Sequence, residues 1–343
     1  MGTYNEILNA WQKENISDDV RLAAILDNQK IALAYHSGKI ENDAITYNDT
    51  REIFEHDGVT SYTGDLRTLF EIKNAKNAHE LFLDTFAKRR PIDFELVKDF
   101  QRTLTQSTYD TRRWQLGERP GEFKHHDYVT GRDEVGAHPD DVEEELGELL
   151  NELYEIPNEK ALTAAAYFHS KFENIHPFAE GNGRTGRLLM NYFLVTHNHP
   201  PIIIHEEDKQ KYYAALESWD KEQKLEPLRS FLQEQTEKTW ERWLQRNHGR
   251  NGKHSPSAED MSTFLIKKAE ELKTKAENAT VLSAGERALC DSAAEELKTL
   301  CEDAISDMSL LNKLKNSENP YVKRAAREIE QAQNRFSRTS TDA

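Results

Sequence analysis

The segment 176–187, with the sequence HPFAEGNGRTGR, combines residue types that together could bind and transfer a phosphate group. Gly-Asn-Gly at 181–183 precedes an apolar helical stretch, and glycines let backbone N–H groups approach an anion closely at the start of a helix. Arg184 and Arg187 are three residues apart, so both guanidinium groups can face one ligand from the first turn. The pattern predicts an anion site for phosphates.

Two further residues of this segment could supply the chemistry. Glu180 directly precedes the glycines, and a carboxylate beside bound phosphates is how proteins commonly hold Mg²⁺. His176 could take a proton from an attacking hydroxyl near neutral pH. A base, a metal ligand, an anion cradle and two cations are the parts that in-line phosphoryl or nucleotidyl transfer needs.

Other interpretations of the chemistry-bearing residues are weaker. Residues 181–186 satisfy G-x-G-x-x-G, but a dinucleotide fingerprint follows a strand, whereas a helical pattern precedes this segment. The histidines match no zinc-binding spacing and are typical of surface or core positions. Cys290 and Cys301 are the only cysteines, which excludes a disulfide framework.

Composition bounds the class of protein. The 343 residues hold 45 Lys+Arg and 61 Asp+Glu, and 45 − 61 gives a net charge of -16, which disfavours nucleic acid and acidic membranes as partners. The longest apolar run, 188–195, is far shorter than the ~20 residues of a spanning helix, and no signal peptide is visible. We expect a cytoplasmic protein that binds neither membrane nor nucleic acid.

Helical periodicity dominates the elements that must position this segment. Before the polar stretch 246–257, helices are predicted over 18–36, 66–88, 92–105, 140–154, 159–175, 184–197, 208–220 and 225–245. Strand signals are sparse: residues 123–130 predict a short hairpin between two glycines, and 202–204 is the one β-branched run. The composition after 257 is again helical and carries no visible chemistry.

The segment HPFAEGNGRTGR resembles the signature of the Fic family, H-x-F-x-(D/E)-G-N-G-R-x-x-R, at every defining position. Flanking features over roughly residues 30–235 are also similar, including PGEFK at 120–124 and PPIIIHEEDKQKYYAALE at 200–217. The resemblance implies a mainly α fold, with a Fic-type helical core, a short β-hairpin flap and a C-terminal helical extension. It also implies transfer of AMP from ATP to a protein hydroxyl, with ATP and Mg²⁺ required.

The domain organisation follows from the resemblance together with the composition. We expect N-terminal helices with an inhibitory motif over 1–60, a Fic catalytic core over 61–245, a linker over 246–257 and a helical extension over 258–343. The partner would be a target protein with a Ser, Thr or Tyr hydroxyl. Modification of the chain itself and a homodimer stay open.

The resemblance assigns roles within the motif. His176 would deprotonate the target hydroxyl, Phe178 would be buried and anchor the loop, and Glu180 would hold Mg²⁺ between the α- and β-phosphates. The phosphate-binding positions would be Gly181, Asn182 and Gly183 in the cradle, Arg184 on the β-phosphate and pyrophosphate, and Arg187 on the γ-phosphate.

Three parts outside the motif also receive roles from the resemblance. A flap that holds the target by strand addition would comprise Phe123, Lys124, His125, His126, Asp127, Tyr128 and Val129. Lys124 departs from the Arg common in relatives at this place. Tyr212 and Tyr213 would wall the adenine, although two tyrosines on a helix are as typical of a core.

The sequence Ser37-Gly-Lys-Ile-Glu41-Asn resembles the inhibitory motif (S/T)-x-x-x-E-(G/N) of the same family, in the class that carries it N-terminal to the core. Glu41 would pair with Arg187 and block productive binding of the γ-phosphate, with Ser37 bracing the motif. In some relatives this glutamate also activates a water that removes AMP from the target, and Glu41 could act in that way as a base.

Two alternatives to adenylyl transfer remain. The first is another phosphate-group transfer on the same scaffold, by a kinase or with another nucleotide donor; Gly183, where a kinase-type relative carries Lys, favours nucleotidyl transfer. The second is a nucleotide-sensing regulatory protein, which the inhibitory motif and the long tail suggest. An intact His176 argues against it, because a binder needs no base.

Overall fold

The computed structural model describes residues 2–60, 62–128, 136–153, 156–250, 258–278, 284–302 and 314–327. The chain divides into two compact units, Met1–Arg246 and Asn247–Ala343. Each unit has a hydrophobic cluster of its own, so each is described by itself.

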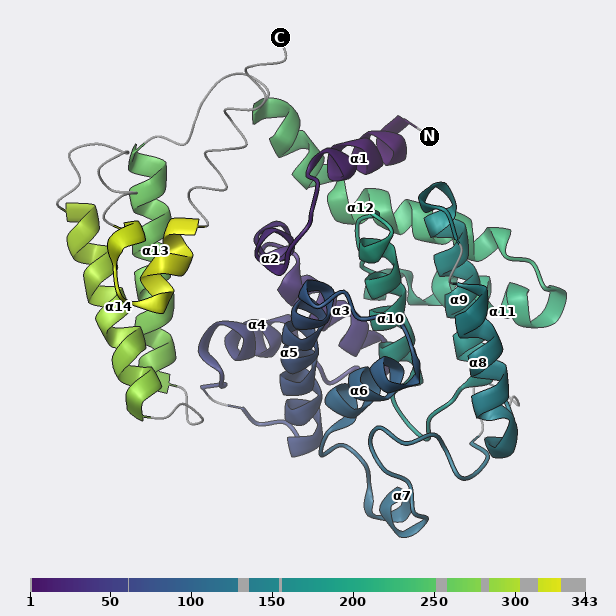
Figure 1. Ribbon diagram of the computed structural model, residues 1–343. Coiled ribbons are helices and arrows are strands. Elements are labelled where there is room, and N and C mark those ends of the chain that lie inside the picture. Colours follow the sequence, from purple (N-terminus) through teal and green to yellow (C-terminus); the bar gives the residue numbers. More distant parts are fainter. Residues whose placement is uncertain are drawn as a thin grey trace. The chain divides into compact units, whose positions relative to one another are not determined.

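The described part of the first unit is built from helices and the loops that join them (Figure 1). Its α-helices are α1 (Gly2–Lys13), α2 (Asp19–Leu26), α3 (Lys30–Glu41), α4 (Tyr47–His56), α5 (Leu66–Ala87), α6 (Phe94–Thr105), α7 (Thr111–Gln115), α8 (Val142–Glu152), α9 (Ala161–Ile175), α10 (Asn182–Thr196), α11 (Lys209–Glu222) and α12 (Glu226–Arg250). Short 3₁₀ turns precede three of them, at η1 (Pro139–Asp141), η2 (Asn158–Lys160) and η3 (Glu206–Asp208). No residue in the described part of this unit is in a β-strand.

Several helices begin where an acidic or hydroxyl side chain caps them. Asp18, Asp65, Asp93 and Asp110 each accept a hydrogen bond from the backbone N–H three residues on, at the starts of α2, α5, α6 and α7. Thr46 does the same for α4. Each cap satisfies a backbone donor that the helix itself leaves free.

The central element is α10, which packs against α9, α6, α5 and α3 (Figure 1). Its side chains are buried on almost every face, as the apolar composition of 184–197 predicts. The core around it includes Phe168 and Phe172 of α9, Phe100 of α6, and Tyr192, all fully buried. A helix enclosed in this way holds its first turn in a fixed place, and the first turn carries the 176–187 segment.

The mainly α class predicted from the sequence is confirmed, with local differences. The helix predicted over 18–36 is two helices: α2 ends at Leu26 and α3 runs on to Glu41. The structure also contains α1 and α4, which the periodicity did not predict. The first part of the predicted hairpin, residues 123–128, is loop, and 129–135 lie outside the described residues.

The β-branched run 202–204 is extended and buried, yet it pairs with no strand among the described residues. Its backbone groups are satisfied by side chains instead. Asn191 bonds both the N–H and the C=O of Ile202, and Thr239 accepts from the N–H of Ile203. Buried backbone groups need partners, and here α10 and α12 supply them.

In the second unit the structure describes α13 (Ala258–Asn278), α14 (Ala284–Glu302) and a further helical stretch at 320–327. Leu265, Ala294, Leu297 and Val322 are among the residues of its apolar cluster. Helix α12 continues to Arg250, so the first residues of the expected linker 246–257 are helical. Residues 251–257 lie outside the described part of the chain.

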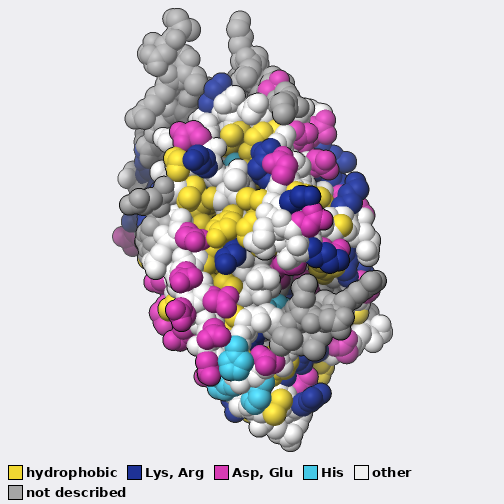
Figure 2. All heavy atoms as spheres, turned by 90° about the vertical axis from the view of Figure 1, so that its right-hand side faces the viewer, with side chains coloured by type: hydrophobic (Ala, Val, Ile, Leu, Met, Phe, Trp, Pro, Cys, Tyr) yellow, Lys and Arg dark blue, Asp and Glu magenta, His cyan; other side chains and the backbone are white. Residues whose placement is uncertain are grey.

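Acidic and basic side chains are interspersed on the face of the protein that Figure 2 shows, around a patch of apolar ones. No single sign of charge covers this face. Of the helices described, none is both long and apolar enough to cross a membrane.

Candidate functional site

The loop between α9 and α10 is fixed from inside by two residues of the motif. Phe178 is fully buried, as predicted. The side chain of Asn182 accepts from the N–H of Phe178 at 2.9 Å and donates to its C=O at 2.7 Å. Both the oxygen and the nitrogen of this amide bond the backbone of Phe178, so the side chain of Asn182 braces the loop.

The start of α10 has the features expected of an anion site, and a carboxylate of the same chain lies against it. Gly181 has φ +82°, a left-handed conformation that glycine adopts without strain. A Cβ on Gly183 would collide with Oε1 of Glu41 and lie 3.0 Å from Nη1 of Arg187. Glu41 thus lies against the first turn of α10, where backbone N–H groups and the helix dipole favour negative charge.

Arg187 is held by the predicted inhibitory motif. Its Nη2 donates to Oε1 of Glu41 at 2.8 Å and to the C=O of Ser37 at 2.8 Å, and its Nε donates to Oγ of Ser37 at 3.1 Å. Arg187 is buried, while the side chain of Glu41 is 35% exposed. Burial opposes ionisation of Glu41, but the Arg187 guanidinium outweighs it and holds the pKa of Glu41 below its ordinary value.

Behind Arg187 lies a buried polar group that the sequence did not indicate. The ring of Tyr212 lies 6.0 Å from the Arg187 guanidinium, and its hydroxyl is 2.6 Å from Nε2 of His169. Burial lowers the pKa of His169 to about 3, so the ring is neutral at pH 7. Burial raises the pKa of Glu173 to about 8, although Arg187 opposes the rise.

The two tyrosines expected near the adenine differ in burial. Tyr212 is 1% exposed and packs on Arg187 and Phe231, as a core residue does. Tyr213 is 40% exposed and stays a candidate for contact with a base. The sequence of α11 could not show which of the two tyrosines is buried. Neighbouring residues on a helix point about 100° apart, so only one of them faces the core, and their spacing does not tell which.

Three arginines converge on Glu180. Nη2 of Arg67 lies 2.6 Å from its Oε1, and Nη2 of Arg184 lies 3.7 Å from the same oxygen. Nη1 of Arg113 lies 3.7 Å from Oε2. Burial raises the pKa of Glu180 despite these cations. Arg67 on α5 and Arg113 on α7 are far from the motif in sequence, and motif reading did not find them.

The surroundings of Glu180 fit a magnesium ion bound together with phosphates. Its Oε2 is buried and has no hydrogen-bond partner among the described residues. Mg²⁺ often takes one protein carboxylate and completes its shell with phosphate oxygens and water. An all-protein cage does not exist in the described part, where no three His, Cys, Asp or Glu side chains cluster for a metal.

His176 ends α9 in a left-handed conformation, with φ 50°. Burial, aided by the Lys124 charge, lowers the pKa of His176 to about 4, so the imidazole is neutral at pH 7. A neutral imidazole can accept a proton, as a general base must. Gly136 packs closely on both side chains: a Cβ there would lie 2.8 Å from Cβ of His176 and 3.1 Å from Nζ of Lys124.

The start of the predicted flap is tied to the motif loop. The N–H of Lys124 donates to the C=O of Pro177 at 2.9 Å, and the Phe123 ring packs 5.4 Å from that of Phe178. Both Phe123 and Lys124 are buried, so they anchor the loop and do not face a target. His125, His126 and Asp127 are exposed, and Val129 lies outside the described residues.

A buried carboxylate that the sequence did not indicate, Glu118, organises the exposed part of this loop. It accepts from the N–H of His125 and lies 3.0 Å from Nδ1 of His126. The Tyr128 hydroxyl also donates to it, at 2.9 Å. One side chain thereby sets the course of the residues expected to meet a target.

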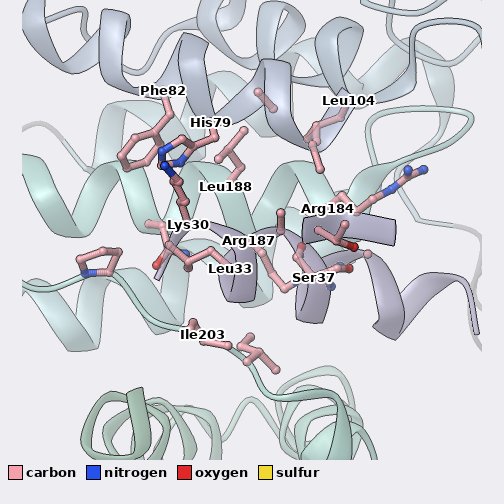
Figure 3. Close-up of a pocket in the computed structure, with 18 of the residues that line it drawn as sticks. Lys30, Leu33, Ser37, His79, Phe82, Leu104, Arg184, Arg187, Leu188 and Ile203 are labelled. Carbon is pink, nitrogen blue, oxygen red and sulfur yellow. Dashed lines mark hydrogen bonds between the residues drawn. The ribbon is translucent and has the colours of Figure 1, made fainter. Parts of the chain in front are cut away.

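A largely apolar cavity of about 80 Å³ lies between α3, α5 and α10, beside the inhibitory motif. Figure 3 shows Ser37 and Arg184 toward one end of it, and His79 and Phe82 toward the other. Arg187 and Leu188 of α10 also line it. The helix that carries the inhibitory motif is therefore not packed tightly along its whole inner face.

Comparison with known proteins identifies this arrangement. Residues 91–194 match the model of the Fic/DOC family. The protein adenylyltransferase Fic of Drosophila persimilis is 30% identical over 220 residues, covering 61% of this chain and 40% of that protein. The protein of the same name from Drosophila willistoni is 32% identical over 220 residues, covering 61% and 41%. The chain spans about two fifths of the length of these curated relatives.

Solved structures agree on the fold. A Fic domain containing signaling protein from Bacteroides thetaiotaomicron VPI-5482 superposes with a TM-score of 0.60 at 22% identity, over 72% of this chain and 97% of that one. A fragment of Fic-1 from C. elegans gives 0.58 at 20% identity, over 72% and 73%. With the motif and the helical body in agreement, residues 91–194 of this chain match a domain of the Fic/DOC family, and the fold is the one that these solved structures share.

Proposed function

We propose that this chain is a protein adenylyltransferase that moves AMP from ATP to a Ser, Thr or Tyr hydroxyl of a target protein, and that Glu41 inhibits it by holding Arg187. One observation carries the proposal. The carboxylate of Glu41 lies against the first turn of α10, bonded to Arg187, in a place built for an anion. A carboxylate of the same chain in this place supports a site that would receive phosphates once Glu41 leaves.

The names of the relatives support the chemistry. The matched proteins from Drosophila are called protein adenylyltransferase Fic, and 61% of this chain aligns with them. The aligned share of those relatives is about two fifths, so the activity comes to this chain as a proposal.

The residues would act as follows. The target hydroxyl oxygen attacks the α-phosphorus of ATP, His176 takes the hydroxyl proton, and the bond to the bridging oxygen breaks to release pyrophosphate. The triphosphate would raise the pKa of His176 from its resting value near 4, because negative charge stabilises the imidazolium. Arg184 would stabilise the charge that develops on the leaving pyrophosphate.

The remaining roles concern binding. Glu180 would hold Mg²⁺, which when bound neutralises part of the phosphate charge. The backbone N–H groups at the start of α10 would receive the phosphates, while Asn182 keeps the loop in shape. Arg187, once released by Glu41, would hold the γ-phosphate. The target would lie along the exposed residues that Glu118 organises.

The test compares four proteins: wild type, Glu41→Gly, Glu41→Gly with His176→Ala, and the control Asp43→Gly. Asp43 is an exposed carboxylate two residues after Glu41. Each protein is incubated with Mg²⁺, a cell lysate and ATP labelled at the α- or the γ-phosphate. We expect α label on protein with Glu41→Gly, at least tenfold above wild type and Asp43→Gly, and none without His176.

Other outcomes would contradict the proposal in distinct ways. Label from the γ position alone would make the protein a kinase on this scaffold. No label from either position, with ATP still bound, would favour a nucleotide-sensing protein or another donor. Equal labelling by wild type and Glu41→Gly would remove the inhibitory role of Glu41.

A further inference from the structure

The two arginines of the motif are held in different ways. Arg187 makes three hydrogen bonds of 2.8–3.1 Å to Ser37 and Glu41. Arg184 instead lies between two carboxylates at longer range, with Nη1 3.6 Å from Glu71 and Nη2 3.7 Å from Glu180. Its Nε is buried and has no hydrogen-bond partner among the described residues. Arg187 is therefore held in place by hydrogen bonds, whereas Arg184 is only oriented by longer-range charge contacts.

Glu71, on α5, is the carboxylate opposite Glu180 in this arrangement, and it lies outside the Fic motif. Its side chain is 5% exposed, so its charge is kept inside the protein by its partners. Oε1 lies 3.3 Å from Nε of Arg67 and 3.6 Å from Nη1 of Arg184. A buried carboxylate between two cations strongly restricts where those cations can lie.

Glu71 also contacts the inhibitory motif. Its Oε2 accepts from Nδ2 of Asn42 at 2.7 Å, and Asn42 directly follows Glu41. The same amide donates to Oγ1 of Thr68, one turn earlier on α5, at 2.9 Å. These contacts thus connect the inhibitory motif, through Asn42 and Glu71, to Arg184.

We propose that Glu71 is a positioning residue for the transfer reaction: it aims the Arg184 guanidinium at the phosphate side of Glu180, where that guanidinium meets the leaving pyrophosphate. The inference rests on the proposed adenylyl transfer. Without Glu71, Glu180 is the one carboxylate of the described residues that still forms an ion pair with Arg184, and the guanidinium shifts onto it. A clamp displaced by even an ångström loses most of its effect on the transition state.

The proposal predicts different effects of Glu71 variants on kcat and on the affinity for ATP. Loss of the Glu71 charge removes a negative group near the phosphates, which favours ATP binding. The misplaced Arg184 guanidinium, in contrast, disfavours ATP binding. The two effects on affinity oppose each other, but only the loss of aim bears on the transition state. We therefore expect Glu71 variants to change kcat far more than the affinity for ATP.

The experiment uses the full chain with Glu41→Gly as parent, so that Arg187 is free in every protein compared. Glu71→Gln keeps the shape and removes the charge, Glu71→Asp keeps the charge, and Glu80→Gln is the control on an exposed carboxylate of the same helix. Transfer of α label is measured at saturating ATP, ATP affinity by calorimetric titration, and folding by thermal unfolding.

We expect Glu71→Gln to lower kcat about tenfold, with the ATP dissociation constant within about threefold of the parent. Glu71→Asp should recover part of the loss, and Glu80→Gln should match the parent. In the parent that also carries Arg184→Lys, Glu71→Gln should lower kcat by less than about twofold, because Glu71 acts through Arg184.

Three results would overturn the inference. Parent-like kcat in Glu71→Gln would show that Arg184 needs no help. An equal fold-loss with Arg184 and with Lys at that position would show an effect independent of Arg184. A parallel fall in rate, affinity and melting temperature, without recovery in Glu71→Asp, would show a purely structural role. If the parent itself transfers no α label, the proposed function fails, and this inference fails with it.

Discussion

At the scale of single residues, the charge state of His176 decides when the site can work. Its resting pKa of about 4 leaves the imidazole neutral at pH 7, which is the form that accepts a proton. Burial is the main cause, and Lys124 adds to it.

Lys124→Gln in the Glu41→Gly enzyme should move the acid limb of the pH–rate profile to higher pH by about half to one unit. The sign follows because a nearby cation disfavours imidazolium; without it the pKa of His176 rises, and the base is lost at a less acidic pH. The initial rate of α-label transfer to one acceptor, followed from pH 4.5 to 8, measures this. Lys124→Arg keeps the charge and should keep the limb, whereas a limb unmoved in Lys124→Gln would exclude the coupling.

Residue types and spacing singled out the segment 176–187, and the resemblance to the Fic family added the buried Phe178 and the pair of Glu41 with Arg187. They were not enough for Glu71 or Arg67, because these two stand four residues apart on a helix, a spacing typical of an ordinary surface ion pair. What distinguishes Glu71 is burial against Arg184 and Asn42, which only the packing of α3 and α10 on α5 creates.

At the scale of elements, α3 is a weakly buried helix of the site. Only Gly38 and Ile40 of its 12 residues are fully buried, and a cavity borders its inner face. Its end is fixed on α5 through the Asn42 amide. A helix with so little apolar burial depends on such polar contacts, which would suit an element that moves away under the proposed inhibition.

Asn42→Ala in the otherwise unchanged chain should raise α-label transfer severalfold, though less than Glu41→Gly does, because Glu41 can still reach Arg187. The loss of buried hydrogen bonds should lower the free energy of unfolding by about 1–3 kcal/mol. Labelling rate and denaturant unfolding check both parts. Asn48→Ala, at an exposed site on α4, is the matched control. If Asn42→Ala is destabilised but labels protein at the unchanged rate, the hydrogen bonds of Asn42 to α5 do not contribute to inhibition.

Helix periodicity predicted most elements of the first unit because their apolar faces repeat clearly, as in α6 and α8. It did not place the break between α2 and α3, where the apolar pattern continues although the chain turns after Leu26. The run 202–204 could not be resolved from sequence either, because its hydrogen-bond partners, Asn191 and Thr239, come from distant helices.

At the scale of the whole molecule, the two units have separate apolar clusters. The cluster of the first unit ends with Trp240 and Leu244 of α12, and the described part of the second cluster begins at Leu265. A unit with its own core can fold without the other.

A chain cut after residue 250 should keep a melting temperature within about 3 °C of the full chain's first-unit transition. In the Glu41→Gly form it should also transfer α label at the same rate, since all the proposed site residues lie in the first unit. Calorimetry and the labelling assay measure this. Aggregation of the shortened chain, or loss of transfer at unchanged stability, would show that the second unit supports the first or recruits its target.

The order of the elements along the chain has a consequence for how the protein is made. Ser37, Glu41 and Asn42 leave the ribosome before the 176–187 segment, with a lead on the order of ten seconds. Trp240, whose indole bonds the C=O of Pro201 and packs on Trp11, comes later still. Under the proposed function, the newborn protein would complete its nucleotide site around an inhibitory helix that has already been made, so no stage of synthesis would offer the cell a finished site without its inhibitor.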